Sequence, residues 1–126
     1  MSQEYIAGSC NIGKGEVRRR QVVALAGAIF SVFALAGLVG SDAAPSARLT
    51  LFIPLFVFAI GFIQSRKKFC LAYGFMGTFN FGKLGQISRV SDPIAKKADR
   101  KTAIIILAQS TALALGLTLA TLALPL

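Results

Sequence analysis

Residues 21–40 read QVVALAGAIFSVFALAGLVG and contain no Asp, Glu, Lys or Arg. As an α-helix this stretch would be about 30 Å long, which is the thickness of the hydrocarbon core of a bilayer. A surface helix of a soluble domain would keep a polar face, and this stretch has none. The stretch therefore predicts a transmembrane helix. We interpret it as an uncleaved anchor that follows a polar cytoplasmic arm at residues 1–20.

Two further uncharged stretches predict two further spans. Residues 49–64 would give a helix of only about 24 Å, so we expect Arg48 to extend towards the lipid surface and lengthen the span. Pro54 within it is tolerated where neighbouring helices compensate for the lost hydrogen bond. Residues 102–126 carry no charge, and 102–124 form the third predicted span. Residues 41–47, with Asp42 and Pro45, predict a short turn between antiparallel helices.

The composition agrees with this pattern. The chain has 126 residues and is 55% hydrophobic, with a mean hydropathy of +0.67, which is too apolar for an ordinary water-soluble domain. All 14 Lys and Arg residues lie outside the three uncharged stretches. The sequence thus predicts an all-α integral membrane protein, a single membrane domain with three transmembrane helices.

Residues 65–101 form a basic loop with an apolar, aromatic and Gly-rich segment at 69–81. The segment is too short to span, so we expect it to lie in the membrane interface or to tuck beneath the helices. Its aromatic residues are Phe69, Tyr73, Phe75, Phe79 and Phe81.

The distribution of positive charge predicts the orientation. The arm holds four Lys or Arg and the loop nine, whereas the turn at 41–47 has none. Because cytoplasmic connections carry the excess of Lys and Arg, we place the N-terminus and the loop in the cytoplasm of a bacterium and the C-terminus outside its inner membrane.

The formal net charge of +9 has two interpretations, nucleic acid or anionic lipid. The basic residues flank apolar spans, which favours lipid headgroups or an acidic partner subunit and not nucleic acid. The residues expected to face lipid or a partner are Arg18, Arg19, Arg20, Arg66, Lys67 and Lys68.

The third span carries small residues at a strict four-residue spacing: Ala108, Ala112, Gly116 and Ala120. Such a stripe lets helix backbones approach closely. It predicts a packing face, used either inside the chain or by a partner, although Ala and Gly are also simply frequent in membrane helices. The first span has a looser counterpart in Ala24, Gly27, Ala28 and Ser31.

Two cysteines, Cys10 and Cys70, are expected on the cytoplasmic side, where a structural disulfide is disfavoured. They are either a pair of thiols for sulfur or redox chemistry, activated by nearby Lys and Arg, or two packing residues. The chain lacks His, the spans lack ionisable residues, and no catalytic cluster is evident. We therefore predict no enzyme activity and no cofactor.

A motif series near the cytoplasmic surface resembles the YgaP-like inner-membrane domain, a two-helix family of largely unknown function that is sometimes fused to rhodanese sulfurtransferases. The resemblance covers about residues 10–82. It departs at Lys68, at Leu71 and in the third helix. It rests on Asn11-Ile12-Gly13, Glu16, Arg18-Arg19-Arg20, Phe69-Cys70, Tyr73-Gly74 and Gly77. The resemblance implies an inner-membrane protein that oligomerises through its helices, with Cys70 as the family-like cysteine and a connection to sulfur chemistry.

These features favour a small accessory or assembly subunit of a larger bacterial membrane complex, respiratory, photosynthetic or transport. The alternative is a thiol protein at the membrane surface that handles sulfur or senses redox state through Cys10 and Cys70. A self-associating pore or carrier is a third interpretation, because a lumen can form between copies.

Overall fold

The computed structural model describes residues 5–80 and 87–125. The chain is mostly helical, and three of its helical segments, Lys14–Gly40, Pro45–Lys67 and Pro93–Ala123, are long and apolar enough to cross a membrane. This confirms the predicted fold class. The element order is α1 (Lys14–Gly40), the 3₁₀-helix η1 (Pro45–Leu51), α2 (Phe52–Lys67), α3 (Leu71–Met76), β1 (Thr78–Phe79), β2 (Ser88–Arg89) and α4 (Pro93–Ala123).

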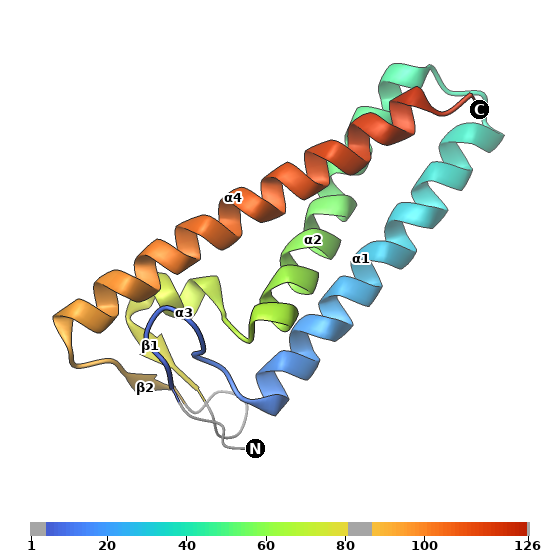
Figure 1. The fold of residues 1–126 in the computed structure, drawn as a ribbon. Helices are drawn as coiled ribbons and strands as arrows, with labels where there is room; N and C mark the ends of the chain where they lie inside the picture. The colour runs from blue at the N-terminus through green and yellow to red at the C-terminus, as the bar shows by residue number, and fades with distance from the viewer. Residues whose placement is uncertain (1–4, 81–86, 126) are drawn as a thin grey trace.

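The three long helices form a layer with α2 in the middle, packed against α1 on one side and α4 on the other (Figure 1). At one end of the layer, η1 lies beside the C-terminal end of α4. At the other end the N-terminal arm, α3, β1, β2 and the start of α4 gather (Figure 1). We call this second group the cap; it comprises residues 5–20, 68–80 and 87–102.

Two glycines allow α1 and α2 to touch backbone to backbone. A side-chain carbon at Gly27 would lie 2.8 Å from the Cα of Phe58, and one at Gly61 would lie 2.7 Å from the backbone nitrogen of Ala24. Ser31 is also buried in this face, where its hydroxyl donates to the carbonyl of Gly27 at 2.7 Å. Most of the looser small-residue pattern of the first span, with the exception of Ala28, is therefore buried within the chain.

The stripe of small residues on the third span is exposed. Ala108, Ala112, Gly116 and Ala120 all face away from the other helices, and a side-chain carbon at Gly116 would meet nothing within 4 Å. The neighbouring face of α4 is the one buried inside the chain, through Ala103, Ile106, Ser110, Ala114 and Thr118. The stripe therefore does not pack inside the chain. Its use as a docking face for a partner stays a prediction.

The helices are longer than the apolar spans at their cap ends. α1 begins at Lys14 and α4 at Pro93, ahead of the predicted spans at 21–40 and 102–124. The start of α4 follows from local chemistry, because the Asp92 carboxylate accepts from the Ile94 backbone N–H at 3.0 Å. Pro93 lacks a backbone N–H, and at the first helical position that group would have no partner within the helix. At the other end, η1 begins at Pro45, inside the predicted turn.

Arg48 does not extend towards lipid as expected. It is only 4% exposed, and its Nη1 donates to the carbonyl oxygens of Thr121 at 2.7 Å and Leu124 at 3.3 Å. The last carbonyls of a helix have no partner within the helix and carry partial negative charge, so a guanidinium satisfies both their hydrogen bonds and their dipole. Arg48 thus fastens η1 to the end of α4.

Candidate functional site in the cap

The N-terminal arm is bound to α4 through a buried carboxylate. The hydroxyl of Tyr5 donates to Oδ2 of Asp99 at 2.5 Å, and the backbone N–H of Gly8 donates to Oδ1 at 2.6 Å. The Thr102 hydroxyl donates to the Gly8 carbonyl at 2.6 Å, and the Tyr5 ring stacks on Phe79 with centroids 4.9 Å apart. Residues 5–9 therefore pack onto the helix and do not form a free arm.

Asn11 joins the arm to the segment that follows α2. Its side-chain carbonyl accepts from the Cys70 backbone N–H at 2.7 Å, and its Nδ2 donates to the Cys70 carbonyl at 3.2 Å. The backbone continues the contact, because Asn80 donates to the Asn11 carbonyl and Gly13 donates to the Asn80 carbonyl, both at 2.9 Å. The arm therefore pairs with the chain beyond β1, in the manner of a short parallel strand.

Glu16 is the centre of the cap and is only 1% exposed. Its carboxylate accepts from Nη1 of Arg20 at 2.7 Å, from the hydroxyl of Tyr73 at 2.6 Å and from Nδ2 of Asn80 at 3.3 Å. The second arm of the Arg20 guanidinium, Nη2, lies 2.8 Å from the sulfur of Cys70. We call Glu16, Arg20, Cys70, Tyr73 and Asn80 the Glu16 cluster.

The cluster compensates the charge of Glu16 within the chain. A buried carboxylate is tolerated when it is paired and hydrogen-bonded, and here one guanidinium, one phenol and one amide supply the partners. The Arg20 guanidinium also lies over the Tyr73 ring, 6.0 Å from its centroid. These contacts hold three segments together: α1, α3 with the preceding Cys70, and the residue after β1.

The two cysteines have separate partners. Cys70 is 2% exposed and lies against Arg20, whereas Cys10 is partly exposed and its thiol lies 3.7 Å from the Ile12 carbonyl. Both thiols are free. Cys70 therefore has the cationic neighbour that the thiol hypothesis requires. The thiol of Cys10 instead donates to the Ile12 carbonyl.

Arg20 differs from the other basic residues that were expected to face lipid or a partner. Its side chain is only 14% exposed and belongs to the Glu16 cluster. The remaining five are exposed: Arg18, Arg19, Arg66, Lys67 and Lys68.

The aromatic segment at residues 69–81 tucks beneath the helices, with Phe69 fully buried against Ala103 and Ile106 of α4. Phe81, the last aromatic of that segment, lies outside the described residues.

The burial of Glu16 and Asp99 was not predicted from the sequence. The four-residue spacing of Glu16 and Arg20 is a recognisable signal for an ion pair on one helix face. Nothing comparable marks Tyr73, Asn80 or Tyr5 as partners, because these contacts join segments far apart in sequence. Five of the residues quoted for the family resemblance are linked by successive contacts in the cap: Asn11, Cys70, Arg20, Glu16 and Tyr73.

Both tyrosines have raised pKa values. Burial raises the pKa of Tyr73, and its hydrogen bond to the Glu16 carboxylate raises it further. Burial and the hydrogen bond to Asp99 likewise raise the pKa of Tyr5 well above the ordinary value of 10.0. In both cases ionisation would place a phenolate beside a carboxylate, so the neutral phenol is favoured.

This gives a pH prediction, because Tyr5 and Tyr73 are the two tyrosines of a chain without Trp. Their contribution to stability is fully present below the unfolded pKa of 10.0 and is lost as pH rises through the higher folded values. We expect the near-ultraviolet absorbance of tyrosinate to stay low at pH 10.0 in the folded protein and to reach half its maximum there after unfolding. Coincident titration curves for the two states would contradict this.

Within residues 5–80 and 87–125, no group of three or more His, Cys, Asp and Glu residues is placed to hold a metal ion. No family model, no curated protein and no solved structure matches the chain.

Proposed function

We propose that the chain is a small accessory or assembly subunit of a larger bacterial membrane protein complex, respiratory, photosynthetic or transport, which acts through helix packing and a basic surface. The observation that carries this proposal is the internal pairing of the cap. Glu16 and Asp99 are fully buried and bonded within the chain, whereas the exposed charge of the described cap is cationic apart from Asp92. The cap thus offers a rigid, positively charged face suited to anionic headgroups or an acidic partner.

The exposed helix faces support a role in assembly. In the most apolar window of α1 only 17% of residues are buried, and the small-residue stripe of α4 is open. In a membrane such faces contact lipid or the helices of another subunit, and small residues favour the latter because they permit close approach. We place the cap in the cytoplasm and the turn that precedes η1 outside the inner membrane, because the excess of Lys and Arg lies in the cap.

Purification from native membranes in a mild detergent tests the subunit proposal. We expect the tagged chain to elute with other membrane proteins at a defined stoichiometry. The Ala112→Leu/Gly116→Leu variant should lose them, because two large side chains block the stripe. The matched control is Ala34→Leu/Gly37→Leu on an exposed part of α1. Recovery of the unsubstituted chain as a lone monomer would contradict the proposal.

The contact of Arg20 with Cys70 favours a second candidate, a thiol protein that handles sulfur or senses redox state at the membrane surface. A guanidinium 2.8 Å from a sulfur stabilises the thiolate, which is the reactive form. The test is alkylation of Cys70 across a pH series in a Cys10→Ser background. At each pH we expect the unsubstituted Arg20 background to be alkylated faster than Arg20→Gln, because the guanidinium lies against the sulfur. Alkylation of Cys70 that is as fast or faster in Arg20→Gln would contradict this candidate.

A further inference from the structure

The outer face of α4 carries a groove at its cap end. The groove has a volume of about 620 Å³ and is lined by Ile94, Lys97, Ala98, Arg100, Lys101, Ile104 and Ile105. Its isoleucines are open to the surroundings, with Ile94 79% and Ile104 53% exposed. Three cations and three large apolar side chains therefore share one surface of one helix.

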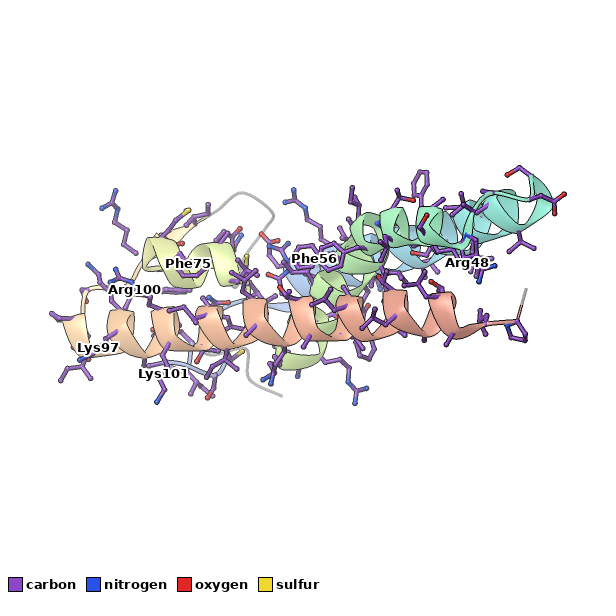
Figure 2. All side chains as sticks on the ribbon, turned by 90° about the horizontal axis from the view of Figure 1, so that it is seen from above. Arg48, Phe56, Phe75, Lys97, Arg100 and Lys101 are labelled. Carbon is purple, nitrogen blue, oxygen red and sulfur yellow. The ribbon has the colours of Figure 1, made fainter. Side chains whose placement is uncertain are left out.

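The cations of this groove have no carboxylate partner among the described residues. The ion pairs between described residues join Glu16 to Arg19 and Arg20, all three of which lie on α1. Asp99 is next to Arg100 in sequence, but it is buried, and its two oxygens bind Tyr5 and Gly8. Figure 2 shows Lys97 and Lys101 on the same side of α4, at the opposite end of the molecule from Arg48. Asp92, at the start of α4, accepts from the Ile94 backbone N–H and forms no ion pair with the three cations. The groove thus keeps a net positive charge within the described chain.

The position of the groove along α4 identifies its ligand. Lys101 is the last charged residue before the uncharged run that begins at residue 102, so the cations lie at the depth of lipid headgroups. Ile104 and Ile105 lie one turn further along, where acyl chains begin. A ligand that fits has an anionic head joined to an apolar chain, with the head at the cations and the chain along Ile104 and Ile105.

We propose that this groove is a binding site for an anionic phospholipid, with the headgroup phosphate held by Lys97, Arg100 and Lys101. An acidic segment of a soluble protein would satisfy the cations but would leave the isoleucines uncovered. The site is separate from the basic residues that flank the first two spans. Because Lys97, Arg100 and Lys101 belong to the cap, the proposal deepens the basic surface of the proposed function and names its lipid ligand, whereas association with a partner subunit is tested separately above.

The test measures lipid adducts by native mass spectrometry of the purified full chain in detergent, titrated with dioctanoyl phosphatidylglycerol or dioctanoyl phosphatidylcholine. The site variant is Lys97→Gln/Arg100→Gln/Lys101→Gln. The matched control, Lys14→Gln/Arg18→Gln/Lys67→Gln, removes the same charge from three exposed residues outside the groove. A third titration uses soluble glycerol phosphate, which has the anionic head without the chains.

We expect the unsubstituted chain to prefer phosphatidylglycerol, and the site variant to bind it at least roughly tenfold more weakly because each surface cation contributes about a fivefold gain. The control should stay within about twofold, because its three charges lie outside the groove and act only by diffuse attraction, which salt screens. Equal losses in both variants would overturn the proposal, because they would indicate diffuse attraction. So would equal binding of the two lipids, or glycerol phosphate binding as tightly as the lipid.

Discussion

The Glu16→Gln variant is expected to lose about 3 kcal/mol or more of folding free energy, which is the typical cost of breaking a buried ion pair from one side. The amide that replaces the carboxylate carries no charge, so the Arg20 guanidinium remains in a buried site without its counterion. The amide also brings its own donors towards the Tyr73 hydroxyl and the Asn80 amide, which donate to Glu16 in the native chain. The measurement is equilibrium unfolding in mixed detergent micelles, followed by circular dichroism.

Asp42→Asn is the matched control for Glu16→Gln, because it removes the same charge from an exposed residue in the turn. We expect it to change stability by less than about 0.5 kcal/mol. A second measurement reports on the cluster itself: in a Cys10→Ser background, alkylation of Cys70 should become faster in Glu16→Gln, since opening the cap exposes that thiol. If both variants unfold at the same denaturant concentration, Glu16 does not hold the cap together.

The Gly27→Ala/Gly61→Ala variant is expected to lose about 3 kcal/mol by overpacking, the upper end of the usual range, since two sites are affected. A methyl group at Gly61 would lie 2.7 Å from the Ala24 nitrogen and 2.8 Å from the Arg20 carbonyl. These are backbone atoms of α1, which cannot rotate away as a side chain can. The two helices must therefore move apart along their whole contact.

The control for the glycine variant is Gly37→Ala/Gly116→Ala, because a side-chain carbon at either position meets nothing within 4 Å. Here alanine should leave stability unchanged or raise it by up to about 1 kcal/mol per site, since glycine is the poorer helix former. Both variants are compared by the same unfolding titration. Equal effects of the two pairs would show that α1 and α2 do not approach through Gly27 and Gly61.

The membrane-spanning architecture was predictable because hydropathy is a local property. Twenty uncharged residues at 21–40 specify a span whatever they pack against, and the same holds for 102–124. Arg48 shows where local reasoning fails. A cation at a span end can extend towards lipid or bind a helix terminus, and the presence of the α4 carbonyls beside it is a tertiary fact.

The packing face of α4 was only partly predictable. The exposed stripe from Ala108 and the buried face around Ser110 and Ala114 both contain small residues at four-residue spacing, and they are neighbours on one helix. Periodicity identifies such stripes but does not show which of them is buried inside the chain. The buried one is chosen by its fit against α2 and by the docking of Phe69.

The cap was the least predictable part, because its contacts join residues far apart in the chain. Tyr5 and Asp99 are separated by 94 positions, and Glu16 and Tyr73 by 57. In the sequence Glu16 and Asp99 are two of the five acids of a basic protein, and such acids are normally solvated surface charges. Their burial depends on the return of the arm, α3 and α4 to one place, and no local pattern encodes that.

Labelling of introduced cysteines in intact bacteria tests the central claim most directly, namely that lipid surrounds the three helices with the cap on the inner side. Asp42→Cys in the turn and Ser91→Cys in the cap are compared in a Cys10→Ser/Cys70→Ser background; both positions are exposed. With a membrane-impermeant maleimide, we predict labelling of the position 42 variant in intact cells and of the position 91 variant only after permeabilisation. Labelling of both in intact cells, or the reverse pattern, would contradict the account.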